Sequence, residues 1–316
     1  MNLGPPHSPT ATEIGHRLEA QLQQVIFGAE QTLHLVTAAL LAGGHVLLED
    51  RPGVGKTLLA KAVAASIGGT SARVQGSIDV LPSDITGSLI LTTGEADPFR
   101  FLEGPVFHNV LLIDELNRIS PRAQAALLEA MEERSVTVNG TQRILPVPFT
   151  VFASQNHANS SGTYPLLQGQ IDRFMIAVTM GMPTPEQETA LLLGERGSGK
   201  LREIRPVTTP DGLLNAQQET ASLYVDKRVA EYLVSLATHT REQLGPIAGA
   251  SPRASLMALA MARALAVLDG RDYVSPDDIQ QAVFPAWGMR LHGDQSELGA
   301  RRLIAGYLAA VPTPQV

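Results

Sequence analysis

Two short runs of the sequence are almost wholly apolar, "HVLLE" at 45–49 and "VLLID" at 110–114. Strands that are apolar on both faces are typical of a parallel sheet covered by helices on each side. Three further runs have the length and composition of strands, at 72–75, 149–154 and 174–178. Helical stretches lie between most of the five runs. The sequence therefore predicts an α/β fold with a central parallel sheet of five strands.

The segments that precede the first strand are predicted to be helical. One helix is expected from about Thr12, as its N-cap, to Gln24, and the next should end at the pair Gly43-Gly44. Residues 1–11 are proline-rich and lack the apolar core of a signal peptide, so they are expected to form a flexible N-terminal segment.

Two insertions interrupt the alternation of strands and helices. Residues 87–107 are predicted to form a hairpin with the turn "TGEADP". Residues 135–145 indicate a sharper hairpin around Asn139-Gly140, a pair that tolerates positive φ at both central positions. An isolated hairpin is more often surface decoration. With two hairpins on one core, a functional role and surface decoration are about equally favoured.

Strand signals give way to helical ones after Val178. Ser251-Pro252 and Ser275-Pro276 are each typical of a helix start. A domain boundary is predicted near Met182, which leaves a core of residues 12–181 and a smaller all-helical domain of residues 182–316.

Composition narrows the classes of function. The 316 residues carry a formal net charge of −7 and only 4% aromatic side chains, which argues against a general nucleic-acid binder. The absence of cysteine excludes disulfides and thiolate metal sites. The uncharged stretch from Leu35 to Leu48 is too short to span a bilayer. The chain is expected to be soluble and cytoplasmic, with no membrane insertion and no nucleic-acid partner.

A phosphate-binding loop is predicted between the first apolar run and the helix after it. "EDRPGVGKT" fits the pattern G-x-x-x-x-G-K-[ST], except that Asp50 replaces the first glycine. Lys56 would reach the β and γ phosphates of a nucleotide, and the Thr57 hydroxyl would ligate Mg²⁺. Backbone N–H groups at the start of the helix would point at the anion. The predicted nucleotide-binding residues of this loop are Pro52, Gly53, Val54, Gly55, Lys56, Thr57 and Leu58.

An acidic pair, Asp114 and Glu115, ends the second apolar run. Asp114 would hold Mg²⁺ through water, and Glu115 would orient or deprotonate the attacking water. Such a pair can simply face solvent, but together with the loop the catalytic interpretation is favoured.

Three more polar residues are candidates for the γ-phosphate: Asn156, Arg173 and Arg253. Asn156 follows a predicted strand, Arg173 precedes another, and Arg253 opens a predicted helix. Taken singly, each is more often a turn residue or a solvated cation.

As a set, these residues resemble the MoxR family of AAA+ ATPases, over roughly residues 25–290. The resemblance rests on six segments in order: "LLAGGHVLLEDRPGVGKTLLAKAVA", "LPSDITGSLI", "GPVFHNVLLIDELNRISPRAQAALLEAMEERSVTVNG", "PFTVFASQN", "GTYPLLQGQIDRF" and "GASPRASLMALAMARALAVLDGRDYVSPDD".

The resemblance implies a role for each candidate. Asn156 is similar to the sensor-1 residue and Arg253 to the sensor-2 arginine of the helical lid. Arg173 resembles the arginine finger that enters a neighbouring subunit's site, which implies a homo-oligomeric ring, usually a hexamer. The hairpins resemble the helix-2 insert and the pre-sensor-1 hairpin, which face the central pore. The adenine pocket would be lined by Ile26, Phe27 and Gly28.

The activity implied by the resemblance is Mg²⁺-dependent hydrolysis of ATP to ADP. Hydrolysis would drive chaperone-like remodelling or maturation of a protein client that contains a von Willebrand factor A domain. In some cases this maturation would include loading of metal into the client. A subunit of a magnesium-chelatase-like complex is a related alternative. A DNA-dependent motor is disfavoured, because no zinc-ligand cluster, helix-turn-helix or basic stretch accompanies the core.

Two residues depart from the family pattern, Asp50 in the loop and His157 after Asn156, where the family has Gly and Pro. A carboxylate about 4 Å from a phosphate charge would cost on the order of 4 kcal/mol at an effective dielectric constant near 20. The first loop position mainly turns the chain out of the strand, so the carboxylate need not lie that close. Asp50 keeps a second hypothesis open, a nucleotide-gated scaffold with weak hydrolysis. His157 is expected to be a tolerated turn substitution.

Overall fold

The computed structural model describes residues 9–50, 53–92, 99–155, 163–164, 166–194, 197–245, 248–291 and 297–315. Several predicted features therefore lie outside the described residues: residues 1–8 of the N-terminal segment, Pro52, the turn at 93–98, Asn156 and His157.

The central sheet has five parallel strands in the order β2-β5-β8-β1-β9. All five predicted strands are confirmed, as β1 (Val46–Leu48), β2 (Ser71–Gln75), β5 (Val110–Asp114), β8 (Thr150–Ser154) and β9 (Ile176–Val178). The carboxyl ends of parallel strands lie at one edge of the sheet, where ligands of such folds bind. This edge receives the phosphate-binding loop after β1 and the acidic pair at the end of β5.

Helices bury both faces of the sheet, as the apolar runs predicted. Val110 and Leu112 of β5 pack with α1 (Ala11–Val25), α2 (Glu30–Leu41) and α3 (Lys56–Ser66). The alternate residues, Leu111 and Ile113, pack on the other face with α5 (Pro121–Glu133). Side chains alternate between the faces of a strand, so a run that is apolar at every position needs a cover on both sides.

The first helix begins earlier than predicted, and its cap is a different threonine. The hydroxyl of Thr10 accepts the N–H of Glu13 at 3.2 Å, and the Glu13 carboxylate accepts the N–H of Thr10 at 3.2 Å. This reciprocal capping box makes Thr10 the N-cap, and Ala11, expected in the flexible segment, is fully buried in the helix. Thr12 lies within the first turn, and its hydroxyl donates to the carbonyl of Val267 at 2.8 Å. The prediction of Thr12 as the cap is therefore wrong.

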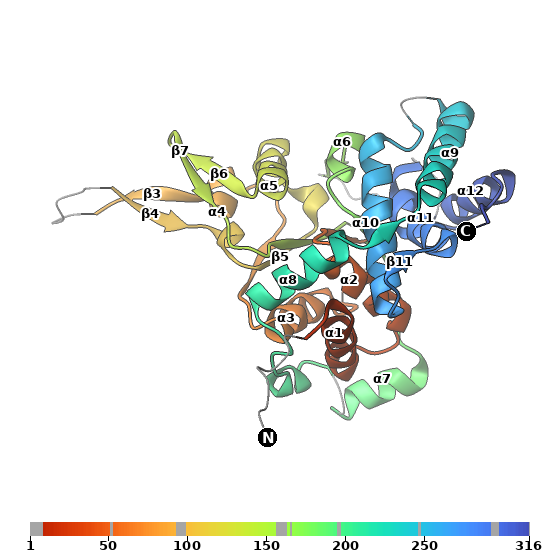
Figure 1. The fold of residues 1–316 in the computed structure, drawn as a ribbon. Helices are drawn as coiled ribbons and strands as arrows, with labels where there is room; N and C mark the ends of the chain where they lie inside the picture. The colour runs from red at the N-terminus through yellow and green to blue at the C-terminus, as the bar shows by residue number, and fades with distance from the viewer. Residues whose placement is uncertain are drawn as a thin grey trace, which may run out of the picture.

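Both predicted hairpins are present, and they extend from the same side of the molecule (Figure 1). The first consists of β3 (Gly87–Leu91) and β4 (Phe99–Glu103), and the second of β6 (Ser135–Val138) and β7 (Thr141–Ile144). Asn139 and Gly140 have φ values of 50° and 76°, as the turn pair predicted. The Arg143 guanidinium lies 3.8 Å from the ring centroid of Phe101, so the two hairpins contact each other.

The region after β9 is helical, as predicted. Its longer helices are α7 (Pro185–Leu192), α8 (Pro210–Ala221), α9 (Lys227–Leu244), α10 (Pro252–Leu268), α11 (Pro276–Leu291) and α12 (Glu297–Ala310). Two short strands, β10 (Tyr224–Val225) and β11 (Tyr273–Val274), pair in parallel and were not predicted. The remaining short elements are α4 (Pro82–Thr86), α6 (Gln168–Ile171), η1 (Pro105–Phe107), η2 (Leu116–Arg118) and η3 (Lys200–Glu203). None of the helices within the described ranges is long and apolar enough to cross a membrane.

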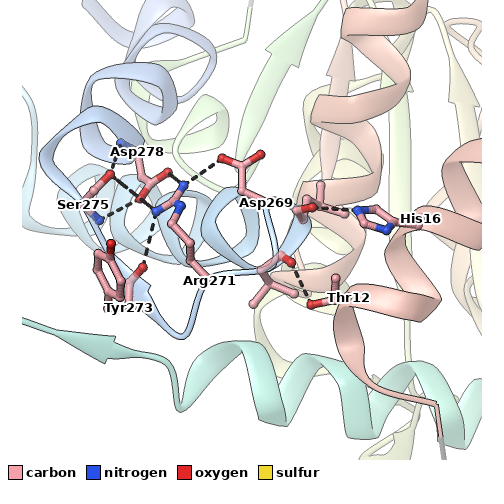
Figure 2. A network of polar contacts seen from close by, with 9 residues as sticks. Thr12, His16, Asp269, Arg271, Tyr273, Ser275 and Asp278 are labelled. Atoms are coloured by element: carbon pink, nitrogen blue, oxygen red, sulfur yellow. Dashed lines mark hydrogen bonds and ion pairs between the residues drawn. The ribbon is translucent and has the colours of Figure 1, made fainter.

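Polar contacts fasten α1 to the end of α10 (Figure 2). His16 Nε2 lies 2.7 Å from the carbonyl of Leu268, next to the Thr12 contact with Val267. On the far side of the same turn, Arg271 binds the fully buried carboxylate of Asp278 through two bonds of 2.5 and 2.6 Å. One buried apolar cluster also runs from α1 along one face of the sheet to α12. The domain boundary near Met182 stays a prediction.

Candidate nucleotide-binding site

The loop between β1 and α3 has the backbone that its glycines predicted. Gly53 and Gly55 have φ values of 92° and 100°, a region that disfavours other residues. No described atom would lie within 4 Å of a Cβ added at either position. The loop therefore presents bare backbone at the N-terminus of α3, where N–H groups and the helix dipole favour an anion.

Lys56 begins α3, and its side chain turns back into the loop. Its Nζ donates to the carbonyl of Asp50 at 2.6 Å, and the residue is only 8% exposed. Burial lowers the pKa of Lys56, while the negative charges of Asp50, Asp114 and Glu115 oppose that effect. The Lys56 cation is thus partly desolvated and held by a backbone carbonyl, from which it could move to phosphate oxygens.

A cavity of about 420 Å³ surrounds the loop, a volume within the range of small-molecule sites. It brings together most of the predicted residues: Gly53, Gly55, Lys56, Thr57, Leu58, Asp114 and Glu115. Val54 is half-buried and packs on the main apolar cluster instead. A larger cavity, about 630 Å³, lies between α2, β9 and α11 and is lined by none of these residues.

The acidic pair is held by contacts from two neighbouring strands. Asp114 Oδ2 accepts from Arg73 Nε at 2.7 Å, and its Oδ1 accepts from the hydroxyl of Ser154 at 3.3 Å. Glu115 has a left-handed φ of 56° and donates its N–H to the same hydroxyl at 2.9 Å. Its carboxylate binds Arg118 at 2.8 Å. A left-handed residue other than glycine is strained, and such strain is common at functional sites.

Gly76 allows β2 to approach this pair closely. Its N–H donates to the carbonyl of Asp114 at 2.7 Å, and an added Cβ would lie 2.2 Å from the carbonyl oxygen of Glu115. Any side chain at this position would push the acidic pair away from its place in the cavity.

Sequence reasoning missed several residues that line the cavity, among them Arg73, Gln75 and Ser154. A signal for them existed. Alternation along β2 places Arg73 and Gln75 on one face, and Gln75 is in register with Asp114. Ser154 ends a buried strand at the same edge of the sheet. Ser198 and Leu201, also in the lining, come from a segment with no such signal.

Asp50 has a structural role that its position in the motif did not reveal. Its Oδ2 accepts the N–H of Met180 at 2.5 Å, in the segment that leaves β9. The carboxylate is thereby anchored to the backbone beside the loop, while the Asp50 carbonyl receives Lys56.

Arg173 and Arg253 lie apart from this cavity, since neither is among its described lining residues. Both bind the carboxylate of Glu132, at 2.9 and 2.8 Å respectively. Ile26, Phe27 and Gly28 do not line the described cavity either; Ile26 is buried, and Gly28 packs against Gln187 of α7. Asn156 lies outside the described residues, but Gln155 before it donates to Glu49 at 2.6 Å.

The donor set of the cavity fits Mg²⁺. The hydroxyl of Thr57 and the carboxylate of Asp114 are oxygen ligands on the same cavity, and Mg²⁺ favours a few protein oxygens together with phosphates and waters. The described residues contain no group of three or more His, Asp or Glu side chains that could hold a metal unaided. A magnesium ion here would therefore depend on the nucleotide for part of its coordination.

A parallel αβα core, with a phosphate-binding loop after β1, an acidic pair at the end of β5 and C-terminal helices, defines the class of AAA+ ATPases. Residues 45–176 match the ATPase family associated with various cellular activities (AAA), and residues 238–302 match the AAA lid domain.

The particular family follows from individual relatives. The chain is 37% identical to chaperone MoxR1 of Mycobacterium tuberculosis, over 95% of this chain and 83% of that protein. It is 43% identical to YeaC of Bacillus subtilis, over 82% and 81% of the two chains. A crystal structure from Cytophaga hutchinsonii superposes with a TM-score of 0.85, at 28% identity over 96% of each chain. This chain belongs to the MoxR family of AAA+ ATPases.

Proposed function

We propose that this chain hydrolyses ATP with Mg²⁺ and uses the reaction to remodel a protein client in a chaperone-like manner. The observation that carries the proposal is the convergence of Lys56, Thr57, Asp114 and Glu115 on one cavity beside a bare glycine loop. Phosphoryl transfer depends mainly on positioning and charge stabilisation, and these four side chains supply both.

Each of the four side chains has a distinct task in this proposal. The loop N–H groups and Lys56 bind the β and γ phosphates. Thr57 and Asp114 would hold Mg²⁺, which supplies neutralisation of the phosphate charge. Glu115 orients the attacking water and takes up its proton, with its backbone fixed by Ser154.

The remaining family residues act around the γ-phosphate. Asn156 would contact the attacking water as sensor 1. Arg173 would act as the arginine finger at the γ-phosphate of an adjacent subunit in a ring, with six subunits as the expected number. Arg253 would act as sensor 2, and because it shares the carboxylate of Glu132 with Arg173, we assign it to the same phosphate. Ile26, Phe27 and Gly28 would contact the adenine. The family resemblance supports a client with a von Willebrand factor A domain.

Removal of the proposed base tests the reaction. Glu115→Gln keeps the shape of the side chain but not its basicity, so steady-state ATP hydrolysis should fall by about 100-fold or more, while nucleotide binding is kept. Glu129→Gln, an exposed glutamate of α5, is the matched control and should retain full turnover. Unchanged ATP turnover in Glu115→Gln would contradict the proposal. The same variant, loaded with ATP, is the bait for affinity capture of the ring and its client.

Asp50 gives a second candidate function, a nucleotide-gated scaffold that binds ATP but hardly hydrolyses it. Asp50→Asn separates charge from geometry, because an amide oxygen can still accept the N–H of Met180. If the charge attenuates the site, both Asp50→Asn and Asp50→Gly should raise ATP affinity or turnover by about 10-fold or more. An effect of Asp50→Asn below about threefold would favour the active ATPase, since the anchored carboxylate then does not disturb the phosphates.

A further inference from the structure

One exposed carboxylate joins the two arginines that lie outside the nucleotide cavity. Glu132, near the end of α5, binds Arg173 through one carboxylate oxygen and Arg253 through the other, at 2.9 and 2.8 Å. The three residues come from α5, from the segment after α6 and from the first turn of α10. Nothing in the sequence linked Glu132 to either arginine.

A second carboxylate, that of Asp172, holds the backbone segments next to both arginines. Its Oδ1 accepts from Arg290 Nε at 2.9 Å, and its Oδ2 accepts from the Ser251 hydroxyl at 3.3 Å. Arg290 is buried and also donates to the carbonyl of Phe174 at 2.5 Å. Asp172 directly precedes Arg173, and Ser251 caps the helix that carries Arg253. Asp172 therefore connects the two backbone segments that carry the arginines, and Glu132 binds the guanidinium groups at the ends of their side chains.

Charge explains why such a residue is needed. Two guanidinium groups side by side repel each other, and the long arginine side chain has many rotamers. A carboxylate between them offsets the repulsion and selects one rotamer for each. The hydrogen bond from Arg253, followed by the charges of Arg253 and Arg173, lowers the pKa of Glu132. Glu132, which we call the clamp, is therefore ionised at neutral pH.

The paired cations remain accessible from outside. Their side chains are 27% and 38% exposed, and within the described structure neither lines the cavity around Lys56. Because Glu132 has only two carboxylate oxygens and each guanidinium has five N–H groups, donors remain for a further anion.

We propose that Glu132 is a positioning residue that holds Arg173 and Arg253 as one paired-cation unit, directed at the phosphoryl group bound by another copy of the chain. This inference rests on the proposed function. It goes beyond it by assigning a residue that touches no nucleotide and by making the two arginines act together.

The kinetic test compares Glu132→Gln with Glu133→Gln, an exposed neighbour on the same helix. A glutamine amide is uncharged and has one acceptor oxygen, so it cannot bind both guanidinium groups as the carboxylate does. Arg173 and Arg253 should then move apart. We expect kcat for ATP to fall by about 10-fold or more, while KM and nucleotide affinity change less than about twofold, and the control should match the wild type. A rise in kcat would overturn the proposal, because Glu132 would then compete with the phosphate. A rise in KM at constant kcat would also overturn it.

Mixed rings test whether the clamp acts across subunits. Glu115→Gln subunits have a disabled site but intact arginines, and Glu132→Gln subunits have the reverse. The mixture should hydrolyse ATP faster than the sum of the two separate proteins. No gain on mixing would overturn the proposal, because a clamp that served its own site could not be complemented.

A chemical test needs no turnover. Phenylglyoxal reacts with free guanidinium groups, so Arg173 and Arg253 should be modified faster in Glu132→Gln than in the wild type, as peptide mass spectrometry can measure. Arg122, an exposed arginine of α5, should react equally in both proteins. Equal rates at Arg173 and Arg253 would show that Glu132 does not hold them. This arm separates the two ideas: absent ATP turnover in the wild type defeats the proposed function, whereas unchanged labelling defeats the clamp.

Discussion

At the residue scale, a buried imidazole next to β1 ties three segments of the core together. His45 Nδ1 accepts the N–H of Val151 at 3.0 Å, so its Nε2 carries the proton and faces the carbonyl of Met131 at 3.3 Å. Both ring nitrogens are satisfied only in the neutral form. Burial, and then the charge of Arg134, lowers the pKa of His45 from 6.5 to about 3.

This pKa shift predicts a loss of stability in mild acid. Below pH 6.5 the unfolded chain binds a proton that the folded chain refuses, so the free energy of unfolding falls as the pH drops from about 6.5 toward 3. The His45 contribution at pH 5 is a loss of about 2 kcal/mol relative to pH 7.5. Urea unfolding at both pH values should show this loss in the wild type and lack it in His45→Gln. An equal pH dependence in both proteins would contradict the assignment.

At the scale of elements, local signals predicted most of what the structure contains. The five strands, the glycine loop, the Asn139-Gly140 turn and the helix starts at Ser251 and Ser275 depend on neighbours within a few residues. The predicted start of α1 was wrong because two threonines, Thr10 and Thr12, both have a side chain that suits an N-cap. Glu13, three residues after Thr10, completes a capping box that Gly15 cannot complete for Thr12, and the hydroxyl of Thr12 instead donates to Val267, far along the chain.

The capping box gives a test of that correction. Thr10→Ala should lower the free energy of unfolding by about 1 kcal/mol, and Thr10→Ser should leave it nearly unchanged. Amide exchange at Glu13 should speed up in Thr10→Ala, since its N–H loses the hydroxyl acceptor. Thr12→Val removes the bond to Val267 but leaves the cap, so exchange at Glu13 should stay slow. Fast exchange in Thr12→Val instead would restore Thr12 as the cap.

At the scale of the whole molecule, the predicted core and helical domain share one apolar interior. The main buried cluster contains Leu18 and Leu22 of α1, Leu40 of α2, and Leu265 and Leu268 of α10. A Cβ on Gly15 would lie 2.4 Å from a methyl carbon of Leu268, so α1 and α10 pack in close contact.

This shared interior predicts a single cooperative unfolding transition. Calorimetry of the full chain should give equal van't Hoff and calorimetric enthalpies, and residues 182–316 expressed alone should not show a cooperative melt. Two separate transitions, or a fragment that melts cooperatively, would instead support independent domains divided near Met182.

The candidate site divides in the same way between local and long-range information. The motif residues Lys56, Thr57, Asp114 and Glu115 could be predicted from local patterns, because the first two begin the helix after the glycine loop and the last two lie at the end of an apolar strand. The contacts of Arg73 with Asp114 and of Asp50 with Met180 could not, since they join segments 41 and 130 residues apart.

By itself, the sequence determined the strands, the helices, the glycine loop and the family, because apolar periodicity and backbone preferences act over a few neighbouring residues. Only the tertiary structure decided which distant side chains meet. It anchored the Asp50 carboxylate beside the loop, placed Arg73 on the acidic pair, and brought Arg173 and Arg253 to Glu132. Electrostatic and hydrogen-bonding partners depend on distance in space, and that distance is set only when the sheet and its helices pack.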